Sequence, residues 1–181
     1  MKSAELSDAD LIRGCVENSR KCQEMLYRRY AGVMFRLCIL YENDRDKAKD
    51  ILQESFIKIF RNMKSFDRKG SLRVWMRKII TNTAIDHFRK NHEESHFIPI
   101  ENIVQTISID ESAVSILNTE DIISQVNRLP VGARMIFQLH AIEGYSHKEI
   151  AHLLKISEGT SKSQINRAKQ LLQHWIGGTC R

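Results

Sequence analysis

The stretch "GYSHKEIAHLLKISEGTSKSQINRAKQLL", residues 144–172, decides the fold of the C-terminal part of this chain. Ser146, followed three residues later by Glu149, forms the pattern of a capping box and predicts that a short helix begins there. The residues "KIS" predict a tight turn, after which Ser157 can cap a second helix. Two helices joined by a short turn, the second of them basic, are typical of a helix-turn-helix.

The second helix divides its residues between an inward face and outward faces. Small and apolar side chains recur at steps of three and four, as one helical face requires, at Ser161, Ile165, Ala168, Leu172 and Trp175. The other faces carry polar and basic residues, which are Lys162, Ser163, Asn166, Arg167 and Lys169. In a helix-turn-helix, such side chains at the start of the second helix meet base edges in the major groove. A solvated helix of a bundle is the alternative that these residues leave open, because mixed charge is normal there.

Composition indicates a helical protein in two parts. The chain's 181 residues suit one ordinary domain or two small ones, and its two prolines and eight glycines are too few for the many turns of an all-β architecture. We therefore expect an all-α fold of two small helical domains joined by a linker, the C-terminal domain containing the helix-turn-helix. The longest run without Asp, Glu, Lys or Arg is eleven residues, 170–180, whereas a membrane span needs roughly 18 apolar residues. The N-terminus also lacks a signal-peptide core, so we expect a cytoplasmic protein without a membrane span.

The charge is distributed in three blocks. The net charge of +6 favours a polyanionic partner. Residues 1–93 carry 20 Lys and Arg against 13 Asp and Glu, and residues 119–181 carry eight against five. Between them, residues 94–118 carry four acids and neither Lys nor Arg. This acidic linker is too apolar for a flexible Gly/Ser type, so two alternatives stay open: it rests in a groove of a partner, or it packs on its own domains.

Periodicity predicts four helices in the N-terminal domain, at about residues 8–17, 20–41, 45–63 and 71–91. Ser7 and Asp44 are the expected N-caps of the first and third helices. The third helix has the clearest apolar stripe, formed by Ala48, Ile51, Leu52, Ser55, Phe56, Ile59, Phe60 and Met63. On the fourth helix, we expect core roles for Trp75, Ile79 and Phe88. Phe66, beside the preceding loop, could serve either the core or base stacking.

The last block begins with two further helices. Thr119 is the expected N-cap of the first, whose inward residues are Ile122, Ile123, Val126 and Leu129. Pro130 suits the start of the next helix, and Gly144 suits its C-terminal end.

Neither the cysteines nor the histidines form a pattern that predicts a metal, a cofactor or catalysis. No C-x-x-C pair occurs among Cys15, Cys22, Cys38 and Cys180, so we expect reduced thiols, mostly buried. The spacing H-E-x-x-H occurs once, at residues 92–96, past the end of the predicted helix rather than on it, the spacing H-x-E occurs at residues 92–94 and 147–149, and no Walker-type pattern is present. His147 and His152 flank a predicted helix but lack further ligands nearby in the sequence. An enzyme acting on nucleic acid would need a carboxylate cluster or an activated nucleophile, so we expect a protein without catalysis.

Two long stretches resemble the bacterial RNA polymerase sigma factors of the extracytoplasmic-function (ECF) group. They are "DKAKDILQESFIKIFRNMKSFDRKGSLRVWMRKIITNTAIDHFRK", which is similar to the N-terminal domain of that group, and "LPVGARMIFQLHAIEGYSHKEIAHLLKISEGTSKSQINRAKQLL", which is similar to its C-terminal domain. The resemblance extends over about residues 8–175. It implies a factor that binds core RNA polymerase, directs promoter-specific initiation and is controlled by an anti-sigma factor. An autonomous helix-turn-helix regulator is the alternative function.

The resemblance also implies three sets of site residues. Docking on the clamp of the β′ subunit of core polymerase would use Asp50, Gln53, Glu54, Lys58 and Arg61, on the exposed face of the third helix. Capture of the separated strand at the −10 element would use Lys69, Ser71, Arg73, Arg77, Lys78, Asn82, Asp86 and Arg89. Reading of the −35 element would use Lys162, Ser163, Asn166 and Arg167. The chain has Ser161 where the group usually has Val and Gln164 where Arg is common, which puts the promoter preference in doubt.

Overall fold

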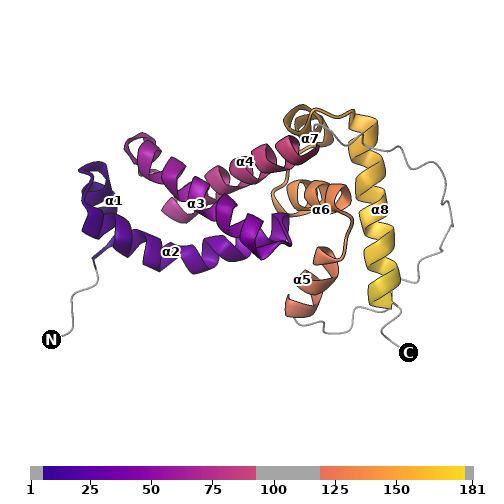
Figure 1. The fold of residues 1–181 in the computed structure, drawn as a ribbon. Coiled ribbons are helices and arrows are strands. Elements are labelled where there is room, and N and C mark those ends of the chain that lie inside the picture. The colour runs from indigo at the N-terminus through magenta and orange to yellow at the C-terminus, as the bar shows by residue number, and fades with distance from the viewer. Residues whose placement is uncertain (1–5, 93–118, 178–181) are drawn as a thin grey trace. The chain divides into compact units, whose positions relative to one another are not determined.

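The computed structural model describes residues 6–92 and 119–177 (Figure 1). The expectations for the linker at residues 94–118 and for Cys180 lie outside these ranges. Contacts divide the chain into two compact units, Met1–Phe88 and Arg89–Arg181. Within the described ranges the regular structure is entirely helical, which confirms the predicted all-α class, and no helix there is long and apolar enough to cross a membrane.

Local hydrogen bonds begin the helices of the N-terminal unit where the sequence predicts them. The elements are α1 (Asp8–Val16), α2 (Arg20–Tyr41), α3 (Arg45–Asn62), the short 3-10 turn η1 (Met63–Ser65) and α4 (Leu72–His92), whose last residues extend past the unit's boundary at Phe88. The Ser7 side chain accepts a hydrogen bond from the Asp10 amide. The Asp44 carboxylate accepts from the amides of Asp46 and Lys47 at 2.9 and 3.2 Å, which satisfies donors that the first turn of α3 leaves open.

The apolar stripe of α3 forms the centre of the N-terminal core. Its residues from Ala48 to Ile59 are buried as predicted, whereas Phe60 is half-buried. Phe56 packs edge-on against Tyr27 of α2, with ring centroids 4.7 Å apart. Helix α4 joins this core, and its Thr81 hydroxyl lies 3.2 Å from that of Tyr41 in α2.

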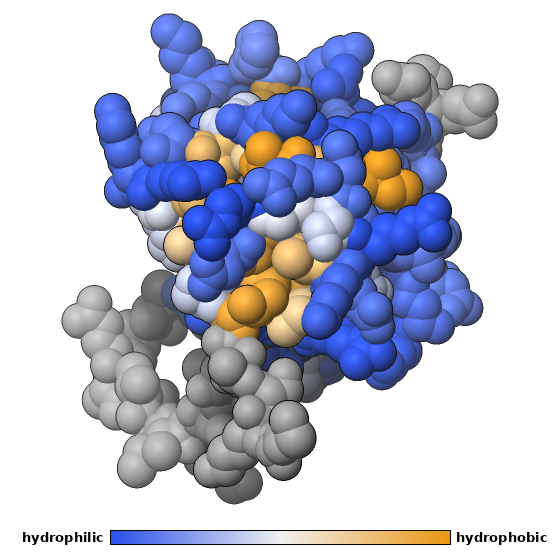
Figure 2. Space-filling model, turned by 90° about the vertical axis from the view of Figure 1, so that its left-hand side faces the viewer, coloured by the Kyte–Doolittle hydropathy of each residue, from blue (hydrophilic) through white to orange (hydrophobic). Residues whose placement is uncertain are grey.

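The aromatic residues around the loop before α4 belong mainly to the core. Phe66 is buried and packs on Trp75 with centroids 5.4 Å apart, so the structure resolves the alternative left open for Phe66. Phe88 is buried as predicted, while Trp75 and Ile79 are half-buried. The face of this unit turned to the viewer in Figure 2 is largely hydrophilic, with small hydrophobic areas between charged and polar side chains.

The C-terminal unit contains α5 (Thr119–Asn127), α6 (Val131–Phe137), the π-helical turn η2 (Gln138–Ile142), α7 (His147–Leu154) and α8 (Glu158–Gly177). Gly144 follows η2 with φ of 79°, a left-handed conformation that glycine adopts without strain. The sequence predicted one uniform helix from Pro130 to Gly144, but its last turn widens into η2. Thr119 is the first helical residue rather than a cap.

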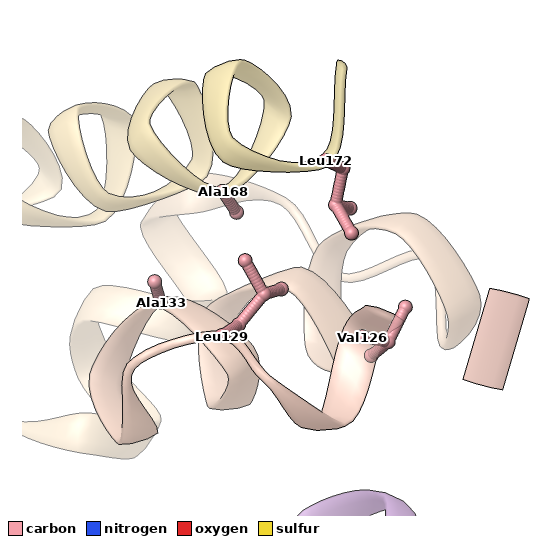
Figure 3. Close-up of a cluster of buried hydrophobic side chains, with 5 residues drawn as sticks. All are labelled: Val126, Leu129, Ala133, Ala168 and Leu172. Carbon is pink, nitrogen blue, oxygen red and sulfur yellow. The ribbon is translucent and has the colours of Figure 1, made fainter. Parts of the chain in front are cut away.

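The long helix α8 covers α5 and α6 and thereby forms the core of the C-terminal unit. Figure 3 shows Ala168 and Leu172 of α8 pointing toward Val126, Leu129 and Ala133. Of the predicted inward stripe of α8, Ser161, Ile165, Ala168 and Leu172 are buried as predicted, whereas Trp175 is half-buried against the same cluster.

One residue of the predicted stripe of α5 does not face this core. Ile123 is 38% exposed rather than inward, and among the α5 side chains that the structure describes, at residues 123–127, the buried one is Val126, near the end that precedes α6. Val126 and the following Leu129 lie at that end and are covered by α8. The side chain of Ile122 lies outside the described part of the chain.

Candidate nucleic-acid interface

Helices α7 and α8 form the predicted helix-turn-helix. Both halves of the capping box are present: the Ser146 hydroxyl accepts from the Glu149 amide, and Glu149 Oε2 accepts from the Ser146 amide at 2.8 Å. Lys155 ends α7 in the left-handed conformation, with φ of 55°. The Ser157 hydroxyl then accepts from the Thr160 amide at 2.9 Å, which caps α8. The turn predicted from "KIS" is therefore confirmed.

Burial on α8 separates the predicted reading face from the packing face. Ser161 and Ile165 are buried, whereas Lys162, Ser163 and Asn166 are exposed. Lys162 Nζ lies 4.0 Å from Glu158 Oε2, and both side chains are largely exposed, so this ion pair is weak. Lys162 therefore stays available to a polyanion.

The fourth residue of the predicted reading set is placed differently from the other three. Arg167 is half-buried, at the border between the exposed face and the core. A long guanidinium side chain can bury its stem at such a border and extend its charged end to a ligand.

A partly buried polar cluster beneath the start of α8 has no counterpart among the residues predicted from the sequence. His147 Nδ1 lies 2.9 Å from the hydroxyl of the fully buried Ser161. The His147 ring stacks on the ring of His140, with centroids 4.4 Å apart and an angle of 22°. His140 Nδ1 donates to the Tyr145 carbonyl at 2.8 Å. Two histidines seven residues apart give no sequence signal, because η2 and the reversal at Gly144 bring them together.

Burial lowers the pKa of His147 below its usual value, and the neighbouring charges of His140 and Lys162 lower it further. The neutral imidazole is therefore favoured in the folded protein.

The predicted −10 residues separate into exposed and half-buried groups. The exposed side chains are Lys69, Ser71, Arg73, Lys78 and Asn82. The half-buried ones are Arg77, Asp86 and Arg89. The loop that carries Lys69 is shaped by Arg68, which has φ of 60°, and by the Asp67 carboxylate, which accepts from the Lys69 amide at 3.1 Å. Exposed basic side chains thus lie in this loop and at the start of α4.

The predicted core-polymerase face of α3 is only partly a solvent face. Asp50, Gln53 and Arg61 are exposed as expected. Glu54 and Lys58 instead lie half-buried against α4, which corrects the expectation that the whole set is exposed. The physical reason is that α4 covers this flank of α3, and the sequence does not show where α4 packs.

Four charged or titratable residues form a network between α3 and α4, defined here as Glu54, Lys58, Asp86 and His87. Lys58 Nζ lies 2.9 Å from Glu54 Oε1 and 3.4 Å from Asp86 Oδ2. His87 donates from Nε2 to Glu54 Oε2 at 2.6 Å. Asp86, predicted to contact DNA, is therefore paired within the protein.

The network shifts the pKa values of Glu54 and Lys58. Hydrogen bonds from Lys58 and then from His87 lower the pKa of Glu54 to about 2. Burial lowers the pKa of Lys58, but the hydrogen bond and charge of Glu54 and the charge of Asp86 outweigh it, and the net shift is upward. The ionised forms of both residues are thus favoured in the folded protein.

Among the described residues, no group of His, Cys, Asp and Glu side chains could hold a metal ion. Cys15 and Cys38 are buried free thiols, and Cys22 is a half-buried one. Burial raises the pKa of Cys38 to about 12, which keeps that thiol protonated.

Comparison with known proteins identifies two family regions in this chain. Residues 26–94 match the family Sigma-70 region 2, and residues 119–172 match the family Sigma-70, region 4. The ECF RNA polymerase sigma factor SigW of Bacillus subtilis strain 168 is 30% identical over 156 residues, which cover 80% of this chain and 83% of SigW.

Two further proteins extend the comparison over most of the chain. The ECF RNA polymerase sigma factor SigM of Mycobacterium tuberculosis strain H37Rv is 27% identical over 175 residues, which cover 96% of this chain and 86% of SigM. A solved structure of the sigma factor RpoE in complex with the anti-sigma factor NepR, from Bartonella quintana, is also similar. It has a TM-score of 0.48 and 22% identity, and the match covers 87% of this chain and 98% of that chain.

Proposed function

This chain belongs to the ECF RNA polymerase sigma factors, and on that premise we propose how its two helical units divide the work of promoter recognition. A sigma factor binds core RNA polymerase and directs promoter-specific transcription initiation, which is the function of this chain. The observation that carries this function is the presence of both sigma-70 regions in order along one chain. It disfavours the autonomous helix-turn-helix regulator, which would need only the second region.

We further propose a division into three parts: residues 1–93 for polymerase docking and the −10 element, an acidic linker at 94–118, and residues 119–181 for the −35 element. The protein would act in the cytoplasm with core polymerase, without catalysis of its own, and under the control of an anti-sigma factor. In a reconstituted reaction, the controlling protein should abolish initiation, and an excess of this chain should restore it.

For the −35 element, α8 would enter the major groove of duplex DNA. The support is the burial pattern: the inward stripe of α8 is occupied by its own core, while Lys162, Ser163 and Asn166 are exposed at its N-terminal half. Arg167 would extend from the border of this face. Polar and basic side chains at the start of a recognition helix are the ones that reach base edges and phosphates.

For the −10 element, the exposed residues of α4 and its loop would hold the separated strand. Unstacking bases costs a few kcal/mol per step, so extruded bases and their phosphates must be held by protein groups. The candidates for direct contact are Lys69, Ser71, Arg73, Lys78 and Asn82, all exposed. The half-buried Arg77 and Arg89 would approach the strand from the edge of this surface. Asp86 would act differently, because Lys58 holds its carboxylate.

For polymerase docking, Asp50, Gln53 and Arg61 would form the contacts on α3. Their support is exposure on a helix whose opposite face is buried in the core. Glu54 and Lys58 would instead hold α4 in place on α3, so they would contribute to docking by positioning these helices.

In vitro transcription tests this assignment. Core polymerase with this chain is expected to initiate at specific promoters in genomic DNA that core polymerase alone does not use. The isolated chain should bind double-stranded promoter DNA only weakly, because its two small reading surfaces need polymerase to set their spacing. Tight, specific binding by the isolated chain without any effect on polymerase would instead support an autonomous regulator.

A further inference from the structure

The cluster of the half-buried His140 and His147 with the buried Ser161 joins the three elements that make up the helix-turn-helix and its support. His140 lies in η2, His147 is the first residue of α7, and Ser161 lies in the first turn of α8. Ser161 is fully buried, and its hydroxyl lies 2.9 Å from His147 Nδ1. A buried hydroxyl is costly unless it is hydrogen-bonded, so this contact is favoured strongly over a rotated helix that breaks it.

A hydrogen bond at each end of the cluster fixes the orientation of its rings. The Tyr145 carbonyl can only accept a hydrogen bond, so His140 Nδ1 carries the proton that it donates at 2.8 Å. This bond orients the His140 ring, and the stack at 4.4 Å carries that orientation to the His147 ring. His147 then meets Ser161 of α8. The loop before α7 thus orients the first turn of α8 through two rings.

The apolar part of the contact between α8 and its support does not depend on orientation in this way. Ala168 and Leu172 are buried against apolar residues, and burial of apolar surface depends little on orientation. A hydrogen bond weakens steeply when its angle changes. Ser161 also adjoins Lys162 and Ser163, two residues of the proposed reading face. A rotation of α8 that displaced Ser161 would displace both of them.

We propose that His147 and Ser161, supported by His140, are positioning residues that set the rotation of α8 and thereby the base pairs at which its outer face discriminates. This inference rests on the proposed reading of the −35 element by α8. None of the three residues needs to touch DNA. Their effect should fall on discrimination between promoters rather than on the amount of active protein.

Holoenzyme transcription from a set of templates tests this proposal. The templates carry the best promoter and single base-pair substitutions through its −35 element, and the readout is the ratio of initiation on the best template to that on each substituted one. His147→Leu and Ser161→Ala remove the hydrogen bond. His147→Asn is the conservative variant, because its side-chain amide lies close to the position of Nδ1. His152→Leu is the matched control, since His152 is an exposed histidine on the same helix.

The expected result is a loss of discrimination that the conservative variant restores. His147→Leu and Ser161→Ala should lower the ratio about threefold to tenfold, the range that corresponds to one net hydrogen bond. His147→Asn should stay within about twofold of the wild-type ratio, and His152→Leu should leave it unchanged. Ser161→Ala removes a single oxygen atom, so it carries the test even if His147→Leu fails to fold.

Two results would overturn the inference in distinguishable ways. If the wild-type ratio persists in both His147→Leu and Ser161→Ala, even where total initiation falls, the cluster only supports folding. If the wild-type holoenzyme itself does not discriminate among −35 templates, the proposed reading by α8 fails and takes this inference with it.

Discussion

Glu54 of α3 accepts a hydrogen bond from His87 of α4, with 2.6 Å between Oε2 and Nε2, across 33 residues of sequence. The other oxygen of Glu54 lies 2.9 Å from Nζ of Lys58, which also approaches Asp86 of α4. Helix α3 carries the proposed polymerase-docking residues and α4 the proposed −10 residues. The network therefore joins the two surfaces that a sigma factor must present together.

Glu54→Gln should destabilise the N-terminal unit by about 0.5–1 kcal/mol at neutral pH, because it weakens a half-exposed charge network. The loss should depend on pH. The folded-state pKa of Glu54 is lowered from 4.5 to about 2, so its contribution is fully present above about 4.5 and is lost as pH falls toward about 2. Denaturant unfolding of both proteins at a series of pH values measures this difference.

Asp50→Asn is the control for that experiment, because Asp50 is exposed on the same helix and outside the network. A difference between wild type and Glu54→Gln that stays constant from pH 6 to pH 2 would contradict the role assigned to the carboxylate.

Gln53→Ala combined with Arg61→Glu should weaken binding to core polymerase while the fold is retained, since both side chains are exposed on α3. Competition against another sigma factor for a limiting amount of core polymerase measures the loss, and thermal unfolding checks the fold. Lys47→Ala, an exposed residue near the start of the same helix, serves as the control. Undiminished competition by the double variant would refute the docking assignment.

Arg167→Ala and Lys162→Ala should lower initiation on promoters that depend on the −35 element. A contact to a base edge is worth roughly 1–3 kcal/mol and would relax preference at one promoter position. A contact to phosphate would weaken all promoters alike and reduce the salt slope by about one unit. Transcription from two templates, one with the −35 element scrambled, separates these cases. Equal losses on both templates would show that α8 is not the reader.

Gly14→Ala should destabilise the packing of α1 on α2 by about 1–3 kcal/mol, the usual cost of overpacking. A Cβ atom at Gly14 would lie 2.2 Å from Sγ and 2.7 Å from Cβ of Cys22, so the two helices would have to separate. Gly32→Ala is the matched control within α2, because a Cβ atom there meets nothing within 4 Å. It should instead stabilise the helix by roughly 0.5–1 kcal/mol. Denaturant unfolding measures both variants, and equal effects would contradict the close approach.

The C-terminal unit should lose stability on mild acidification because of His147. Its folded-state pKa is lowered, first by burial and then by the charge of His140, so the unfolded chain binds its proton more tightly. The contribution of the neutral ring is fully present above the usual value of 6.5 and is lost as pH falls below it. Lys162 and Lys169 lower this pKa further, whereas Glu158 opposes them.

Thermal unfolding between pH 8 and pH 5 tests this dependence, with His147→Asn as the comparison. The variant should show a smaller loss of melting temperature across this range, because an amide does not titrate. Identical pH profiles for the two proteins would contradict the lowered pKa of His147.

The sequence alone was sufficient for the features that depend on neighbouring residues. Ser7, Asp44, Ser146 and Ser157 were predicted as caps, and each accepts a hydrogen bond from an amide two or three residues later. Such bonds close within a single turn of chain, so residue type and spacing determine them. The inward stripe of α8 was predicted for a similar reason, because helical periodicity specifies which side chains share a face.

Only the tertiary structure decided which flank of each helix is covered. The expectation that Glu54 and Lys58 are exposed was wrong because α4 covers their side of α3, and their partner His87 is far away in the sequence. The stacking of His140 on His147 likewise depends on the widened turn η2 and the reversal at Gly144. Periodicity separates an apolar face from a polar one, but a polar face pairs with whatever the packing of the other helices brings to it. Contacts of that kind depend on the position of the whole helix, which no local spacing of residues encodes.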